Sequence, residues 1–313
     1  MLKLNKNKAF SLIELSIVIL IIGILVAGVT QSSRLISRMK VMSARSLTLS
    51  SPVSSIKDIY SWHETVMEAS FDEAEASDSS RITNWYDINP QVSSGKIMVT
   101  QSDVNLKPIY LSNRINGLPV INFDGSDRIQ SQIAVPAIAS MGSATIFSVF
   151  NAQDVSNQRF LLFQLQTNCA NNIEIGLSAG SFNIGNFGIH SGCGYATATS
   201  ASFMATNQNY VMTMIMASTP LASGQAGNIQ VFRNGVQQTT FANGGGYNTG
   251  LGGSYAKANS MLNFGGRFSS GFVDDCRFIG NVGEIIIFSR ALNTEERQSV
   301  EKYLGKKWGI VVQ

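Results

Sequence analysis

A single carboxylate interrupts a long apolar run near the start of the chain. The run covers Phe10–Val29, and its main polar residues are Ser11, Glu14 and Ser16. A helix of about 20 residues spans roughly 30 Å, which is the hydrocarbon thickness of a bilayer. An acid inside hydrocarbon costs roughly 2.5 kcal/mol or more, so it generally has a partner. Glu14 is therefore the first residue for which a function is expected.

Carboxylates and histidines elsewhere give little support to catalysis. A retaining glycosidase needs a nucleophile and an acid about 5 Å apart. Glu174 and Glu284, however, each stand alone in their apolar segments. A Ser-His-acid triad would have to use His63 or His190, and no nucleophile elbow supports either histidine. We therefore expect that the protein is not an enzyme.

Metal binding also has weak support. The chain has two His and three Cys without zinc-type spacing, and we expect no cofactor. Calcium is the open alternative, because oxygen-rich turns suit that ion. Its candidate ligands are Asp124, Asp127, Asp274 and Asp275. Asp is common in turns in any case, because its side chain bonds the local backbone.

Two cysteines lie on either side of a predicted hairpin. They are Cys169 and Cys193, and the turn is expected near Ser178–Ser181. Antiparallel pairing would bring the two close, and a disulfide there would contribute roughly 3 kcal/mol. Such a bond requires an oxidising compartment and leaves Cys276 unpaired. The alternative is that all three cysteines are free thiols.

The elements that position these residues are predicted to be mainly strands. The middle of the chain mixes Gly, Ser, Asn and Thr with short apolar stretches, which favours an all-β domain. Asn234-Gly235 lies between two alternating runs and predicts a hairpin. Near the C-terminus, a strand over Glu284–Ser289 precedes a helix that Asn293 and Glu296 cap.

Helical character is predicted to continue beyond the apolar run, to about Ser50. Leu35, Met39, Met42 and Leu49 recur on one helix face. Two explanations stay open: an amphipathic helix packed on its own domain, or an extended helix that carries a globular head. Pro52 marks the expected end.

The segment KAFSLIELSIVILIIGILVAGV resembles the N-terminus of type IV prepilins and type II secretion pseudopilins. The resemblance implies that a prepilin peptidase cuts between Ala9 and Phe10 and that Phe10 becomes N-methylated. It also implies that Glu14 pairs with the amine of a neighbouring subunit in a filament, an attraction that is strong at low dielectric. The family usually has Gly before the cut, where this chain has Ala9.

The C-terminal segment resembles the closing motif of laminin G-like, concanavalin A-like jelly rolls in bacterial surface proteins. The matching residues are Gly283, Glu284, Phe288, Arg290, Leu292, Glu296, Arg297, Tyr303, Leu304, Lys307, Trp308, Gly309 and Ile310. Upstream, Asn116–Ile129 and the Trp85-x-Asp87 element fit the same family. Domains of this kind mostly bind glycans or proteins.

Aromatic side chains beside Asn or Asp would mark a glycan site. Tyr195, Tyr247 and Tyr255 lie in Gly-rich stretches that we expect to be loops, and they are the candidate ligand contacts. They also fit ordinary loop residues that cap the core.

The sequence thus predicts a long N-terminal α-helix followed by an all-β concanavalin A-like jelly-roll sandwich with a short C-terminal helix. The expected parts are a leader at 1–9, a transmembrane and assembly helix at 10–52, and a jelly-roll domain at 53–313. A net charge of +3 is too small to argue for nucleic acid.

The predicted function is a pilin-like subunit with a lectin-type domain, in a minor or tip position, that adheres to glycans or surfaces. The alternative is a type II secretion pseudopilin that contacts cargo or machinery. The expected partners are other pilin or pseudopilin subunits, the prepilin peptidase, the inner membrane and a glycan or surface ligand. The expected location is the inner membrane before assembly, and the periplasm or a cell-surface filament afterwards.

Overall fold

The computed structural model describes most of the chain except its first residues and several inner segments. The described residues are 11–136, 138, 141, 143–155, 159–164, 173–180, 183–191, 194–198, 204–217, 229–238, 241–244, 260–266 and 277–313. The chain forms two compact units, Met1–Ser43 and Ala44–Gln313. We call the second of these the head unit.

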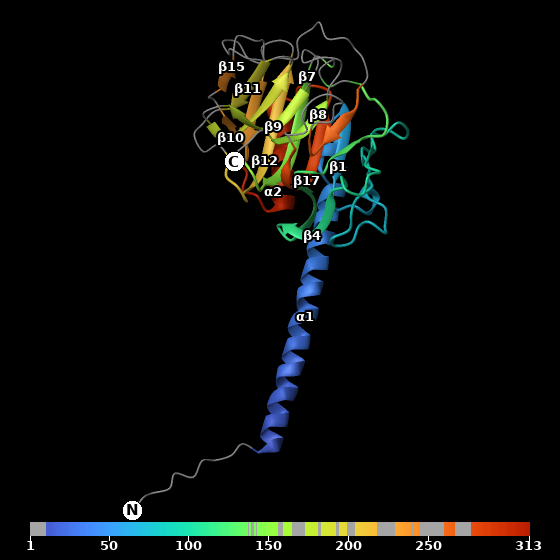
Figure 1. The fold of residues 1–313 in the computed structure, drawn as a ribbon, viewed down its shortest axis with the longest axis vertical. Helices are drawn as coiled ribbons and strands as arrows, with labels where there is room; N and C mark the ends of the chain where they lie inside the picture. The colour runs from blue at the N-terminus through green and yellow to red at the C-terminus, as the bar shows by residue number, and fades with distance from the viewer. Residues whose placement is uncertain are drawn as a thin grey trace, which may run out of the picture. The chain divides into compact units, whose positions relative to one another are not determined.

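Helix α1 covers Leu12–Leu49 without a break (Figure 1). Its 38 residues give it a length of roughly 57 Å. Among the described residues, it is the one helix that is long and apolar enough to cross a membrane, and its most apolar 18-residue window has a mean hydropathy of 2.9. A 3-10 helix follows at Pro52–Ser55, and Ser51 is extended, because a proline disfavours helical geometry in the residue before it.

The described strands of the head unit form two antiparallel sheets. The first sheet has the order β14-β13-β12-β7-β17-β5-β4, and β1 also pairs with β17. Its strands are β1 Ile59–Glu64, β4 Ile109–Ile115, β5 Leu118–Asp124, β7 Ser143–Ala152, β12 Asn209–Ala217, β13 Ile229–Arg233, β14 Val236–Gln238 and β17 Ile279–Phe288. Strand β17 is central: β7 lies along one side, and β5 and β1 share the other.

The second sheet has the order β15-β11-β10-β9-β8-β16-β6-β3-β2. Its strands are β2 Asn84–Trp85, β3 Val99–Thr100, β6 Ile129–Ser131, β8 Arg159–Gln164, β9 Ile173–Gly180, β10 Asn183–Ser191, β11 Gly194–Ala198, β15 Phe241–Gly244 and β16 Leu262–Phe264. The predicted antiparallel β-sandwich is therefore confirmed, together with the long N-terminal helix and the short C-terminal one.

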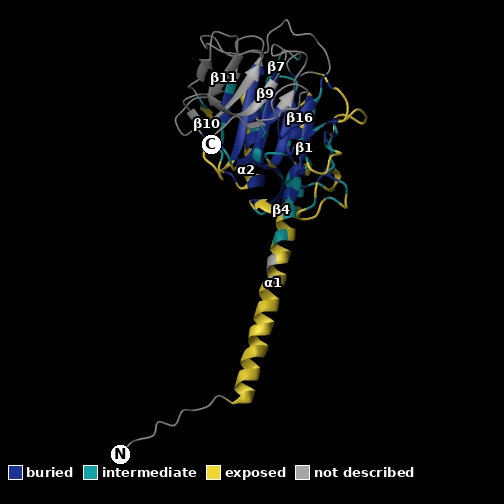
Figure 2. Cartoon of the chain, viewed as in Figure 1, coloured by how far each residue is buried: buried dark blue, intermediate teal, exposed yellow. Residues whose placement is uncertain are grey.

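The main core lies between the two sheets. It brings together alternate residues of the first sheet, such as Phe123 and Phe150, with residues of the second sheet, such as Leu162 and Phe264. Figure 2 shows the strands of the first sheet mainly as buried and nearly all of α1 as exposed. Side chains that alternate with the core residues point to the outer face of the first sheet.

Helix α2, Thr294–Trp308, packs on part of that outer face. The side chain of Thr213 in β12 donates to Glu301 of α2 at 2.7 Å. The start of the helix has the predicted capping box, because the side chain of Asn293 accepts from the amide of Glu296 and that of Glu296 accepts from the amide of Asn293. Trp308 at the other end is fully buried, as expected for a core residue.

The predicted Asn-Gly hairpin is also present. Asn234 and Gly235 connect β13 to β14 with φ angles of 50° and 81°, and Arg233 pairs with Val236 across the turn. Both central residues are in the left-handed region that a tight two-residue hairpin turn requires.

Three local predictions need correction. The strand expected at Glu284–Ser289 begins earlier, at Ile279. Its first half was not predicted because it contains the weak strand formers Gly280, Asn281 and Gly283. Tyr195 lies in strand β11 and not in a loop. Leu49, the last member of the predicted apolar helix face, is 71% exposed.

At this end of α1, the residues that become buried are small. They are Ala44 and Thr48. The Nε of Arg45 donates to the carbonyl of Val66 at 2.8 Å. The last turn of α1 is thus held in the head unit by close backbone approach and polar contacts, and not by the predicted apolar face.

Candidate functional site

The start of α1 is capped by Ser11 and Glu14. Glu14 Oε2 accepts from the amide of Ser11 at 2.9 Å, and Ser11 Oγ accepts from the amide of Ile13 at 3.3 Å. Such a capping box satisfies backbone donors that the helix cannot. Glu14 thus has a role within its own helix, while its pairing with a neighbouring subunit stays a prediction. The cleavage residues, Ala9 and Phe10, lie outside the described residues.

Two buried carboxylates of the head unit meet in a closed ion cluster. Glu64 and Glu284 are register partners on β1 and β17. The ammonium of Lys307 lies 2.8 Å from Glu64 Oε2 and 2.9 Å from Glu284 Oε2, and all three side chains have 0% exposure. The strand pairing of Glu284 with a second carboxylate was not predicted from the sequence.

Further donors complete this cluster. Glu284 accepts hydrogen bonds of 2.8 Å from Trp62 Nε1, Trp308 Nε1 and the hydroxyl of Tyr303. Burial raises the pKa of the Tyr303 hydroxyl well above its usual value, so it remains a donor. A carboxylate pair that is bridged by a cation and closed to water has no access to a substrate and is unsuited to act as nucleophile and acid.

His63 is a core residue. It is buried, and its Nε2 lies 2.8 Å from the carbonyl oxygen of Ile97. Burial lowers its pKa, so the ring is neutral at pH 7. Its ring packs edge-on against those of Trp85 and Phe264. These contacts make His63 a packed core residue, and its buried Nδ1 has no hydrogen-bond partner among the described residues.

The other histidine is placed by its backbone alone. His190 lies in β10, and its side chain is outside the described ones. The segment Gly176–Gly180 matches the pattern Gly-x-Ser-x-Gly, but it lies within strand β9. This strand pairs with the antiparallel strand β10, which follows it in the chain. A nucleophile elbow requires a strand-to-helix turn, so this match is not an elbow.

Asp124 and Asp127 share the turn after β5. Asp127 Oδ2 accepts from the amide of Asp124 at 3.0 Å, and Asp124 Oδ1 accepts from the amide and hydroxyl of Ser126. No group of three or more His, Cys, Asp or Glu that could hold a metal occurs among the described residues. Asp274 and Asp275 lie outside them, and calcium stays a prediction.

The other predicted site residues are not described. These are Cys169, Cys193, Tyr247 and Tyr255, so the disulfide and the two loop contacts stay predictions. Tyr195 is placed only by its backbone, which pairs with His190 and Gly244.

A row of four asparagines crosses the first sheet. Asn281 of β17 is the register partner of Asn122 on β5 and of Asn151 on β7, and Asn151 is in turn the partner of Asn209 on β12. We call these four residues the asparagine row. Neighbouring strands are about 4.8 Å apart, so the row extends over roughly 14 Å.

The row lies on the outer face of the sheet. Its members alternate with core residues such as Ile121 and Phe150. On β12, Asn209 and Thr213 have the same parity, and Thr213 contacts α2. The asparagine row thus continues the face that α2 covers further along the strands.

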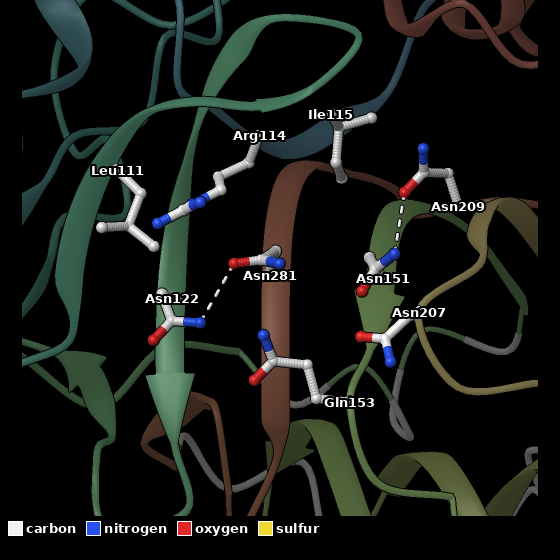
Figure 3. A pocket seen from close by; sticks show the side chains of 9 residues that line it. All are labelled: Leu111, Arg114, Ile115, Asn122, Asn151, Gln153, Asn207, Asn209 and Asn281. Atoms are coloured by element: carbon white, nitrogen blue, oxygen red, sulfur yellow. Dashed lines mark hydrogen bonds between the residues drawn. The ribbon is translucent and has the colours of Figure 1, made fainter.

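The four amides pair in twos (Figure 3). Asn122 Nδ2 donates to Asn281 Oδ1 at 3.0 Å, and Asn151 Nδ2 donates to Asn209 Oδ1 at 2.9 Å. Among the described residues, no group bonds the remaining amide atoms, which are the Oδ1 of Asn122 and Asn151 and the Nδ2 of Asn281 and Asn209. Each half of the row therefore keeps one acceptor and one donor free.

A pocket of about 430 Å³ opens over the row. Its lining adds Leu111, Arg114 and Ile115 from β4, and Gln153 and Asn207 from the segments beyond β7 and before β12. The guanidinium of Arg114 makes no hydrogen bond to any described residue. The pocket is thus lined by five asparagines, one glutamine, one cation and two aliphatic side chains.

This pocket was not predicted from the sequence. The available signal was an isolated Asn inside the apolar strand segments Val120–Phe123 and Ser148–Ala152. Asn is depleted in strands, so these two positions were informative. Their alignment depends on the strand order, which joins segments as far as 159 residues apart and which the sequence alone did not give.

Comparison with known proteins identifies the N-terminal segment. Residues 4–30 match the model of the prokaryotic N-terminal methylation motif. This motif supports a pilin- or pseudopilin-type subunit, and it points to a structural role. No curated protein matches the chain in sequence.

Solved structures resemble the β-sandwich. A mutant GH54 α-L-arabinofuranosidase soaked with 4-nitrophenyl α-L-arabinofuranoside has a TM-score of 0.50 at 9% identity, and the match covers 80% of this chain and 63% of that chain. Domain 4 of AbnA, a GH43 arabinanase from Geobacillus stearothermophilus, has a TM-score of 0.48 at 13% identity, with coverages of 78% and 97%. A pentraxin from Limulus polyphemus has a TM-score of 0.42 at 14% identity, with coverages of 58% and 79%. At these identities the likeness shows the fold alone.

Proposed function

We propose that this protein is a pilin-like subunit, cleaved between Ala9 and Phe10 and N-methylated at Phe10, which carries a ligand-binding head unit into a filament. The observation that supports the proposal most strongly is the methylation motif over residues 4–30, which leads directly into the apolar part of α1. Glu14 then neutralises the new amine of a neighbouring subunit inside the bilayer or the filament.

The size of the head unit favours a minor or tip position. It extends over Ala44–Gln313, and a bulky domain on every subunit would crowd the packing of assembled helices. A subunit at the tip avoids this restriction and presents its surface first. The proposed role is therefore adhesion to glycans or other surfaces by a lectin-type head. The laminin G-like relationship is part of this proposal.

The experiment is mass spectrometry of the mature N-terminus after co-expression with an active prepilin peptidase. The expected product begins with a methylated Phe10. Ala9→Gly is the matched variant, because it restores the residue that the family usually has before the cut and should raise the cleaved fraction. An intact Met1 in both the wild type and Ala9→Gly would refute the proposal.

The same motif also fits a type II secretion pseudopilin. The proteins with which this subunit co-assembles distinguish a pilus subunit from a pseudopilin. Affinity capture of the mature protein from its native host should recover pilus subunits. Recovery of subunits of a type II secretion system, without pilus subunits, would replace the adhesive role with the pseudopilin role while the processing result still holds.

A further inference from the structure

The pocket over the asparagine row has the donors and acceptors of a binding site, and the fold uses only part of them. The two bonds within the row satisfy half of its side-chain atoms. Asn151 and Asn281 are 8% and 7% exposed, and neither has a buried side-chain atom without a hydrogen-bond partner, so their free amide atoms are open to the pocket. Stabilisation of the sheet alone would be served better by β-branched residues at these positions.

The side-chain amides that line the pocket are suited to bind hydroxyl groups. In each pair, the free amide oxygen can accept from one hydroxyl and the free amide nitrogen can donate to another, which matches hydroxyls of a sugar. The two pairs repeat this arrangement along three strand spacings of about 4.8 Å each. A linear oligosaccharide presents hydroxyls in a similar repeating row.

Arg114 adds a preference for negative charge. It is the one charged residue among those that line the pocket. Arg114 has a small effect on Asp78, whose pKa is lowered mainly by hydrogen bonds from Ser112 and to a smaller degree by Arg114. The guanidinium donors of Arg114 thus remain available for a planar carboxylate, which they fit in a bidentate manner.

Other ligand classes fit less well. Peptides bind mainly at sheet edges or through apolar anchors, whereas the row lies on the face of central strands and has no aromatic residue. Nucleic acid requires several cations along its backbone, and the pocket offers one. Lipid chains need an apolar lining, but only Leu111 and Ile115 provide one here.

We propose that the asparagine row and Arg114 form a binding site for a linear acidic oligosaccharide, with a sugar carboxylate at Arg114 and sugar hydroxyls along the row. This rests on the proposed function, since a head unit displayed outside the cell is the one that meets such glycans.

The test is a binding titration of the full chain in detergent micelles with three linear uronic acid oligomers: oligogalacturonate, alginate and hyaluronan. Each is paired with its methyl ester, which keeps the hydroxyls and removes the charge. We expect at least one acid to bind about tenfold or more tightly than its ester, because a charge-assisted hydrogen bond is lost in the ester. The oligomer that binds shows whether the glycan is of plant, bacterial or algal, or animal type.

Variants on exposed residues locate the site. Arg114→Gln should remove the preference for the acid over its ester. Asn209→Ala should weaken both ligands by a similar factor. Lys302→Gln on α2, which also removes an exposed positive charge, is the matched control and should change neither. Circular dichroism and the melting temperature confirm that each variant is folded.

Three results would overturn the assignment: a folded chain that binds none of these oligomers or esters, equal binding by the wild type and Arg114→Gln, or a peptide that competes at the row. A purely structural row would show a lower melting temperature in Asn209→Ala with unchanged binding. These binding measurements do not depend on the N-terminal processing. A negative binding result would therefore leave the pilin-like assignment in place, and an unprocessed N-terminus would leave the binding result in place.

Discussion

Glu64 and Glu284 stand directly opposite each other on β1 and β17, and each gives a carboxylate oxygen to the single ammonium of Lys307. Like charges in directly opposed positions destabilise a sheet. Here the cation and the surrounding hydrogen-bond donors compensate the repulsion between the two carboxylates. The cluster also connects β1, the first strand after α1, to β17 and α2, the last strand and helix of the chain.

Lys307→Met should strongly destabilise the head unit. The substitution leaves two buried carboxylates without their cation, and breaking a buried ion pair in this way costs about 3–5 kcal/mol. Chemical denaturation of the full chain measures the loss. Lys306→Met is the matched control, because Lys306 is exposed and adjacent in sequence. Equal losses in the two variants would show that the cluster is not what stabilises this region.

Glu14→Gln should reduce filament assembly and leave membrane insertion intact. The amide keeps the length of the side chain and can still cap Ser11, but it cannot neutralise an amine. The measurement is the fraction of the protein in sheared filaments relative to the membrane fraction. Ser11→Ala is the control, since it removes the bond from Ile13 and keeps the carboxylate. Normal assembly of Glu14→Gln would contradict the proposed pairing.

Asp127 should make the head unit less stable as the pH rises from about 4 to about 7. Burial is the main cause that raises its pKa to about 7. The hydrogen bond from the amide of Asp124 opposes the rise, as does Arg81, whereas the carboxylate of Asp124 adds to it. The unfolded chain releases this proton near pH 4 whereas the folded chain keeps it until about pH 7, so stability falls across that window and then levels off.

Asp127→Asn removes this titration and still offers an oxygen to the amide of Asp124. The variant should therefore gain stability over the wild type at pH 8 and gain little at pH 4. Urea midpoints at both pH values check the difference. A gain that is the same at pH 4 and pH 8 would exclude Asp127 as the titrating group.

Gly235→Ala should destabilise the head unit more than Gly95→Ala does. Both glycines have positive φ, 81° and 77°, so each substitution carries a backbone cost of about 1–2 kcal/mol. A Cβ at Gly235 would also lie 2.4 Å from the carbonyl oxygen of Gln313, whereas nothing lies within 4 Å at Gly95. The melting temperature of Gly95→Ala measures the backbone strain alone, and that of Gly235→Ala measures the strain together with the steric clash at Gln313. Equal decreases in the two variants would show that the C-terminal residues move to relieve the clash.

Local signals in the sequence predicted local structure well. The Asn-Gly hairpin at 234–235, the capping box of Asn293 and Glu296, and the buried Trp308 all depend on residues a few positions apart. The methylation motif is similar, because it is a continuous segment whose apolar length and single acid define it. Such features need no knowledge of the strand order.

Features that depend on long-range pairing were not predictable in the same way. Glu64 and Glu284 appeared as unrelated single carboxylates, and their meeting depends on the register of β1 against β17. The asparagine row likewise requires four strands to align, one of which begins at Ile279, well before its predicted start. Alternation shows which face a residue occupies but not which strand lies beside it.

The position of β17 between β5 and β7 has a consequence for biogenesis. Asn122 and Asn151 are synthesised early, yet the residue that joins them, Asn281, arrives near the end of the chain. An incomplete polypeptide therefore has no continuous row. Under the proposed glycan binding, the site would be complete only after the last strand is inserted, so an unfinished copy would not bind sugars.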